Sequence, residues 1–314
     1  MNKILIVLGV LIVVGGAAFL LIQGTTSTYE ADEVEVVVVE EEMMEVEPGG
    51  GIGDGAQPLN ELIAAEAGPV EVIGSSVEGR DITAYHFGTG EKEVMFIGGI
   101  HGGYSWTTAL MAFELVEYLE NTPSAVPEGV RVTVIPTVNP DGLYSVTGTE
   151  GLFAASDVAS SQAVKVAGRF NANEVDLNRN FNCLWEETGT WQNQSVSGGE
   201  MPFSEPESQA VRDYVELYNP VAVVAYYAAA GGVYSSNCKN GVMAETLALT
   251  NTYAAASGYT AHEEFDFYDI TGDMVNWLAA KQIPAISVLL TTHEDTEWDK
   301  NLKGITAVLS SISN

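Results

Sequence analysis

Four runs of almost unbroken apolar residues alternate with helix-like stretches between residues 93 and 292. An unbroken apolar run of this length is typical of a strand that is buried on both faces of a sheet. The runs are EVMFIGGI at 93–100, VRVTVI at 130–135, PVAVVAYYA at 220–228 and PAISVLLTT at 284–292. Stretches with apolar residues at helical spacing occupy 107–122, 204–218 and 272–282.

Two further strand-like runs, at 70–74 and 82–88, flank the turn-rich segment SSVEGRD and predict a hairpin before the first buried strand. Strands that alternate with helices indicate an α/β protein. We expect a three-layer α/β/α sandwich around a mixed, mostly parallel sheet.

The first residues of the chain form a separate apolar segment. Residues 4–22 carry no charge, and as a helix they would span roughly 28 Å, close to the ~30 Å hydrocarbon core of a bilayer. We therefore predict a transmembrane anchor or uncleaved signal at 1–23. A cleaved signal peptide is the alternative, although its apolar core is usually about 7–15 residues. Lys3 before the segment and acids after it place the rest of the chain outside the cytoplasm.

Residues 24–58 form an acidic, low-complexity segment with ten acidic residues and no basic one. Such a composition favours a solvated tether that is extended by self-repulsion. Within it, VEVVVV at 34–39 has strong β propensity, so a strand used for assembly is the alternative. The globular domain is expected at 59–314.

The globular part is also strongly acidic, within a chain whose formal charge is −31. This argues against nucleic-acid binding, which needs basic surfaces. The two cysteines, Cys183 and Cys238, are an even count that is compatible with one disulfide in an oxidising compartment. Both follow stretches that lead to strand ends, so we expect the disulfide at the rim of a cleft.

Sites in sheets of this kind gather at the carboxyl ends of the strands. The pattern GRFNANEVDLNRNF at 168–181, together with GSSVEGRDI, IHGG, TVNPDG, SEPES and YDITGDMVNW, resembles the zinc metallocarboxypeptidases of the carboxypeptidase A and D type. The resemblance runs in family order from Gly74 to Gly304. It implies a carboxypeptidase-like fold, a zinc ion, and cleavage at the C-terminus of a peptide.

The resemblance places the zinc ligands and the general base at positions that have mostly been substituted. His101 matches the first ligand. The second ligand, a Glu, falls at Tyr104 or Ser105, and the third, a His, falls at Tyr227 or Ala228. The general-base Glu falls at Leu289, or at Leu290 in a shifted alignment. Zinc sites normally use three or four protein ligands, so the resemblance predicts a degenerate metal site with no cofactor, unless the family activity is retained.

The substrate-binding positions are intact by the same comparison. Arg169 matches the arginine that stabilises the oxyanion, and the pair Asn178–Arg179 matches the residues that hold the terminal carboxylate. Tyr268 matches the tyrosine that closes over the substrate. A guanidinium group suits a carboxylate because it offers two parallel hydrogen bonds.

Each of these residues also has a purely structural interpretation. His101 alone is compatible with a hydrogen-bonded histidine at a strand end, and the arginines with structural ion pairs. Asn178 is compatible with a turn cap and Tyr268 with a core position. His86, His262 and His293 have no ligand spacing among themselves, so we expect them on the surface or in loops.

The favoured hypothesis is a membrane-anchored, extracytoplasmic pseudoenzyme that binds the C-terminal carboxylate of a peptide, or of a cell-wall peptide, without hydrolysis. One alternative is an active zinc carboxypeptidase with compensating ligands. Another is a structural surface or filament subunit that self-assembles and uses the fold as a scaffold.

Overall fold

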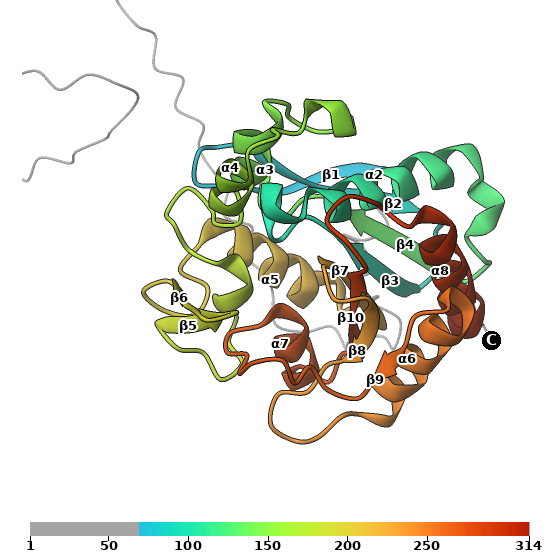
Figure 1. Cartoon of the computed structure of the whole chain (residues 1–314). Coiled ribbons are helices and arrows are strands. Elements are labelled where there is room, and N and C mark those ends of the chain that lie inside the picture. Colours follow the sequence, from blue (N-terminus) through green and yellow to red (C-terminus); the bar gives the residue numbers. More distant parts are fainter. Residues whose placement is uncertain (1–68, 314) are drawn as a thin grey trace, which may run out of the picture. The chain divides into compact units, whose positions relative to one another are not determined.

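The computed structural model describes residues 69–313, which form an α/β fold around one large sheet (Figure 1). This sheet has eight strands in the order β1-β2-β4-β3-β7-β10-β8-β9. The strands are β1 (Val70–Ser75), β2 (Asp81–Phe87), β3 (Lys92–Ile97), β4 (Val130–Ile135), β7 (Ala222–Ala228), β8 (Gly232–Ser235), β9 (Ala261–His262) and β10 (Ala285–Leu290). A separate hairpin pairs β5 (Thr188–Trp191) with β6 (Gln194–Ser197).

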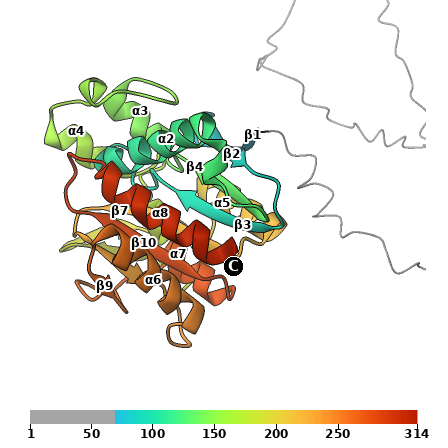
Figure 2. The ribbon, with the colours of Figure 1, turned by 90° about the vertical axis from the view of Figure 1, so that its right-hand side faces the viewer.

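Helices cover both faces of the sheet. The α-helices are α2 (Trp106–Asn121), α3 (Pro140–Thr147), α4 (Gln162–Ala167), α5 (Pro206–Tyr218), α6 (Ala244–Ser257), α7 (Met274–Ala280) and α8 (Trp298–Ser313). Short 3-10 helices are η1 (Gly102–Ser105), η2 (Pro123–Ala125), η3 (Ala155–Asp157) and η4 (Leu177–Arg179). In Figures 1 and 2, α5 and α7 lie on one side of the sheet, and α2, α6 and α8 lie on the other.

The central strand β7 shows why its sequence is apolar throughout. Val223, Ala225 and Tyr227 belong to the core cluster that includes residues of α5 and α7. The alternate residues Val224 and Tyr226 belong to the cluster that includes residues of α2, α6 and α8. Because successive side chains of a strand point to opposite faces, a strand between two helical layers must be apolar at every position.

The predicted architecture is confirmed for the described residues. The hairpin predicted before the first buried strand is the antiparallel pair β1–β2. Pairings β3–β4, β3–β7, β7–β10 and β8–β9 are parallel, whereas β1–β2, β2–β4 and β8–β10 are antiparallel. The sheet is therefore mixed, with a majority of parallel pairings.

Several elements were not predicted from the sequence pattern. The strands β5, β6, β8 and β9 are each at most four residues long, so they contain too few residues for periodicity to appear. The helices α3, α4, α6 and α8 were also missed. In α6, threonines and alanines occupy much of the helix, and apolar residues do not gather on one side.

The predictions for 1–23, for the tether at 24–58 and for the assembly strand at 34–39 lie outside the described residues. Within residues 69–313, no helix has the length and apolarity needed to cross a bilayer. The domain boundary predicted at residue 59 also precedes the first described residue.

His86 corrects one expectation. It lies in β2, where its side chain is buried rather than on the surface. Its Nδ1 is 3.1 Å from Thr133 Oγ1, and its Nε2 is 3.3 Å from Glu71. Thr133 Oγ1 and Tyr214 Oη each donate a 2.7 Å hydrogen bond to the buried Glu93 carboxylate. These groups form a polar network under α5, and burial raises the pKa of Glu93.

Candidate functional site

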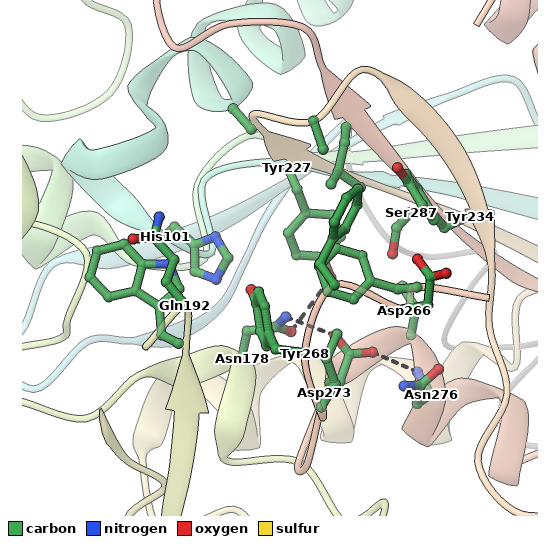
Figure 3. Close-up of a pocket in the computed structure, with 18 of the residues that line it drawn as sticks. His101, Asn178, Gln192, Tyr227, Tyr234, Asp266, Tyr268, Asp273, Asn276 and Ser287 are labelled. Carbon is green, nitrogen blue, oxygen red and sulfur yellow. Dashed lines mark hydrogen bonds between the residues drawn. The ribbon is translucent and has the colours of Figure 1, made fainter. Parts of the chain in front are cut away.

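A cavity of about 780 Å³ lies where β7 and β10 end. Figure 3 shows most of the residues that line it. They come mainly from the segment after β3, from η4, from the β5–β6 turn, from β7, β8 and β10, from the loop that precedes α7 at 264–273, and from the first turn of α7. The carboxyl ends of the parallel strands therefore form the site, as the sequence predicted.

His101 lies in this cavity with only 6% of its surface exposed. Neither ring nitrogen has a hydrogen-bond partner among the described residues. Its Nε2 is 3.7 Å from Asp176 Oδ1, and its ring centroid is 5.6 Å from that of Tyr227. Burial, followed by the charge of Arg169, lowers the pKa of His101 well below its usual range, so the imidazole is neutral. The expectation of a hydrogen-bonded strand-end histidine is therefore wrong.

Tyr104 and Ser105 occupy the region where the second ligand was expected, and they differ in position. Tyr104 lines the cavity, where its ring packs at 4.9 Å against Trp191 and at 4.5 Å against His293. Ser105 is buried within the helical turn, and its hydroxyl has no described partner. His293 lies in a loop, as expected, and this loop brings it to the cavity, which the sequence did not predict.

The third-ligand and general-base positions also face the cavity. Tyr227, Ala228 and Leu289 all line it, whereas Leu290 is fully buried in the sheet. The Tyr227 hydroxyl donates a long hydrogen bond of 3.5 Å to Asn178 Oδ1. Burial raises the pKa of Tyr227 well above its usual range, so its hydroxyl stays protonated. Tyr227, Ala228 and Leu289 themselves offer a protonated phenol and two aliphatic side chains, and none of the three can serve as a base.

Arg169 is a buried ion-pair partner. Its Nε and Nη2 donate hydrogen bonds of 3.0 and 2.7 Å to Asp176 Oδ2. Burial alone would raise the pKa of Asp176, but the positive charges of Arg169 and Arg179 outweigh burial and lower it to about 2. The guanidinium also stacks over the Trp191 ring at 4.3 Å. A local acid therefore already neutralises Arg169.

Arg179 is different because backbone oxygens hold it. Its Nε and Nη2 donate to Thr190 O at 3.1 and 2.7 Å, and its Nη1 donates to Asn178 O at 2.7 Å. It is 1% exposed, and no carboxylate of residues 69–313 lies within ion-pair distance of it. Its guanidinium lies 5.9 Å from the Tyr268 ring centroid. A buried positive charge without a counterion is costly, so the position favours an anionic ligand.

Asn178 is held by the start of α7. Its Nδ2 donates a 2.7 Å hydrogen bond to Asp273 Oδ2, and its Oδ1 accepts one of 3.1 Å from Met274 N. Asp273 caps α7 by accepting from Asn276 N at 2.9 Å. Burial raises the pKa of Asp273. Asn178 is therefore fixed in orientation, and one N–H of its amide group remains available.

The loop at 263–269 forms the outer wall of the cavity. Phe265, Phe267 and Tyr268 form a chain of ring contacts, and Phe267 is 62% exposed. Glu264 and Asp266 from the same loop also line the cavity. Sequence reasoning identified only Tyr268 in this loop. The alternation of acids and aromatics in EEFDFYD was the signal that could have indicated a binding loop.

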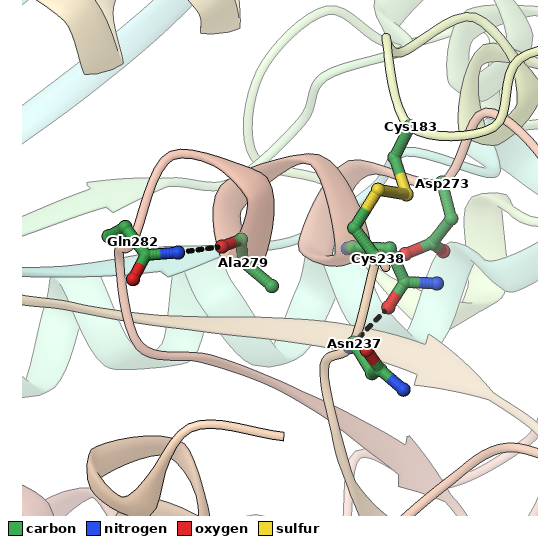
Figure 4. The surroundings of a disulfide bond; sticks show 7 residues. Cys183, Asn237, Cys238, Asp273, Ala279 and Gln282 are labelled. Atoms are coloured by element: carbon green, nitrogen blue, oxygen red, sulfur yellow. Dashed lines mark hydrogen bonds between the residues drawn. A yellow bond between two sulfur atoms is a disulfide. The ribbon is translucent and has the colours of Figure 1, made fainter. Parts of the chain in front are cut away.

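The predicted disulfide is confirmed. Cys183 and Cys238 are bonded, with their Cα atoms 5.8 Å apart (Figure 4). Asn237, the neighbour of Cys238, lines the cavity. The bond therefore joins two loops beside the site.

Comparison with known families and proteins agrees with this arrangement. A family model described as zinc carboxypeptidase matches residues 65–297. The chain belongs to the zinc carboxypeptidase family.

Among curated relatives, the carboxypeptidase N catalytic chain of Homo sapiens is 31% identical over 186 residues, which are 49% of this chain and 38% of that protein. The gamma-D-glutamyl-L-diamino acid endopeptidase 1 of Lysinibacillus sphaericus is 26% identical over 215 residues, 62% of this chain and 54% of that protein. The inactive metallocarboxypeptidase ECM14 of Ajellomyces dermatitidis is 30% identical over 172 residues, 49% of this chain and 28% of that protein. The matched regions thus span about half or less of each relative's length.

Solved structures show the same fold at low sequence identity. Thrombin activatable fibrinolysis inhibitor superposes with a TM-score of 0.63 at 17% identity, over 81% of this chain and 72% of that one. Murein-tripeptide amidase MpaA from Escherichia coli O157 superposes with a TM-score of 0.54 at 18% identity, over 82% of this chain and 97% of that one.

The residues at the site of this zinc carboxypeptidase family member do not fit a zinc ion. Within residues 69–313, no three His, Cys, Asp or Glu side chains are grouped so that they could hold a metal. His101 offers one nitrogen donor, and its nearest carboxylate, Asp176, is already bound to Arg169. A catalytic zinc site normally needs three protein ligands. The donor set is therefore too small.

Proposed function

We propose that this chain is a non-hydrolytic member of the family that binds the C-terminal carboxylate of a peptide. The observation that carries the proposal is Arg179, a buried cation at the cavity that has no carboxylate partner among the described residues. The remaining N–H of the Asn178 amide and the Tyr268 ring lie beside it. A carboxylate at this place would gain charge-assisted hydrogen bonds and would neutralise the guanidinium.

The loss of hydrolysis is supported by the same cavity. Leu289 stands where a general base is expected, and the phenol of Tyr227 stands where a ligand is expected. One of the similar proteins is itself named an inactive metallocarboxypeptidase, which supports the proposal. An active enzyme would need compensating ligands, and residues 69–313 offer no group of three.

Cell-wall peptides are the first ligands to test. Two similar proteins are named for a murein tripeptide and for a bond beside an L-diamino acid. We further propose that residues 1–23 anchor the chain in a membrane and that the domain faces the extracytoplasmic side, where such peptides occur. The proposed membrane anchor and the proposed extracytoplasmic location are both independent of the ligand site.

The test is a binding titration with short peptides that have either a free or an amidated C-terminus. A hydrogen bond to a charged group is worth about 1.5–3 kcal/mol, so the free acid should bind roughly 10- to 150-fold more tightly. Arg179→Ala should remove this difference. Arg212→Ala is the matched control, because Arg212 lies in α5 and pairs with Asp213 away from the cavity. Equal binding of both peptides to the unaltered protein would contradict the proposal and favour a structural role of the outer surface.

A further inference from the structure

The disulfide belongs to a closed chain of contacts that ends on the two residues of the proposed carboxylate site. One branch begins at Cys183, whose carbonyl oxygen accepts a 2.8 Å hydrogen bond from Gly272 N. The carbonyl oxygen of Gly272 in turn accepts a 3.0 Å bond from Phe181 N. Both the N–H and the carbonyl oxygen of Gly272 are therefore bonded to residues 181–183, which follow Arg179. These two bonds join that segment to the start of α7.

The other branch begins at Cys238. Its neighbour Asn237, labelled in Figure 4, donates a backbone hydrogen bond of 2.9 Å to Asn276 Oδ1. The backbone N–H of Asn276 donates to Asp273 Oδ1 at 2.9 Å, and Asp273 Oδ2 accepts from Asn178 at 2.7 Å (Figure 3). Both branches therefore meet at residues 272–273, and the bond between the two sulfur atoms closes the ring.

Gly272 explains why this ring fixes Arg179 as well as Asn178. Gly272 has a φ of +63°, and a Cβ atom added to it would lie 2.0 Å from Arg179 O. The two backbones are therefore in direct contact, and this contact requires glycine. Any displacement of the loop at 272 must move the backbone of Arg179 too.

We propose that the disulfide, Asp273 and Gly272 form a positioning clasp, which holds Asn178 and Arg179 in the geometry for a carboxylate and releases them when the disulfide is reduced. The role for the ligand rests on the proposed function above. Reduction by an external dithiol breaks the Sγ–Sγ bond and leaves two thiols here and one disulfide on the reductant, so two electrons and two protons are transferred. The half-buried Cys238 is the more accessible end of the bond.

The ring predicts a local effect. Without the sulfur bridge, Asn237 is no longer tied covalently to the 183 loop, and the start of α7 is then joined to residues 178–183 only by the hydrogen bonds of Gly272 and Asp273. Local opening of a segment is measured by hydrogen exchange of its backbone amides. The amides expected to exchange faster are those of residues 178–183 and 272–277.

The experiment compares the full chain before and after reduction, together with two variants. Cys183→Ala/Cys238→Ala removes the bridge, and Asp273→Ala removes the shared acceptor while the bridge stays. Ser161→Ala is the matched control, because it removes the N-cap of α4, which is not part of the ring. Hydrogen–deuterium exchange is measured for each protein, and so is the ratio of affinities for the free and the amidated peptide.

The expected result is that the exchange rate of the backbone amides rises about tenfold or more in the two named segments only, and that the affinity ratio falls. Both effects should appear in the two variants and after reduction, but not in Ser161→Ala. Unchanged exchange in both segments would overturn the clasp, whatever the peptides do. A uniform rise through the whole domain in both variants would also overturn it, since the ring would then be a general staple. A local rise without any discrimination between the peptides by the unaltered protein would uphold the clasp and refute the proposed function.

Discussion

Replacing Asp176 by Asn tests whether the interior of the cleft is stabilised by one buried ion pair. The change removes the charge that neutralises Arg169, and both side chains are at most 2% exposed. Removing one partner of such a pair typically costs about 3–5 kcal/mol, because the other charge stays buried without compensation. For a domain of this size, about 2–4 °C per kcal/mol gives a drop in melting temperature of roughly 6–20 °C.

The pair also has a characteristic pH dependence. The pKa of Asp176 is about 2 in the folded protein, against a usual value of 3.8. Because the folded pKa is depressed, the carboxylate contributes stability above pH 3.8, and this contribution is lost as the pH falls through about 2. One pKa unit corresponds to about 1.4 kcal/mol, so about 2.4 kcal/mol depends on this group.

The assay is urea unfolding of the wild type, Asp176→Asn and the double variant Arg169→Met/Asp176→Asn between pH 7 and pH 2. The single variant should be the least stable at pH 7, and the double variant should recover part of the loss because no charge is left unpaired. The difference between wild type and single variant should shrink toward pH 2. If the single and double variants are equally stable, or if the difference does not change with pH, the ion pair is not the stabilising element and the reasoning fails.

Three further predictions follow from other parts of the molecule. The fragment 59–314 should purify without stoichiometric zinc, and near-equimolar zinc in elemental analysis after dialysis against a weak chelator would contradict the donor set described above. Glu93→Gln should gain stability relative to the wild type as the pH rises from 4 to 7. The pKa of Glu93 is raised in the folded protein, so the stability that its protonated carboxyl contributes is present below about pH 4.5 and is lost as the carboxyl ionises. A constant difference in melting temperature between the two proteins across this pH range would count against this. Gly272→Ala should destabilise the domain by about 1–3 kcal/mol or displace Arg179, because Gly272 has a positive φ and an added Cβ atom would lie 2.0 Å from Arg179 O. Unchanged melting together with unchanged peptide discrimination would show that the contact tolerates a side chain.

The central strands could be predicted because their environment is uniform. The apolar run at 222–228 has helices on both faces, so the apolar character of each residue is enough to predict that it is buried. The hairpin β5–β6 has no such pattern, yet Trp191 and Gln192 at its turn line the cavity. Their role depends on where a four-residue strand lies in space, which local periodicity does not encode.

The cleft residues show the same limit. The motif placed Arg169, Asn178, Arg179 and Tyr268 beside the cavity, and the structure brings them together. The sequence left a structural ion pair open for both arginines, however, and only the structure separates them in this respect. Asp176 reaches Arg169 with bonds of 2.7 and 3.0 Å, whereas Arg179 meets only carbonyl oxygens among the described residues. His293 was missed because its contact with Tyr104 joins segments almost two hundred positions apart.

The position of β10 in the sheet determines when the chain can fold. This strand lies between β7 and β8 although it occupies residues 285–290 of a 314-residue chain. Until it is synthesised, β7 has one open edge and β8 has no neighbour on its inner side. Pairings between residues so distant in sequence form slowly, and exposed strand edges promote aggregation. A nascent chain that stops before residue 285 therefore lacks the strand that joins β7 to β8, and we expect the native sheet to form only after residues 285–290 are available.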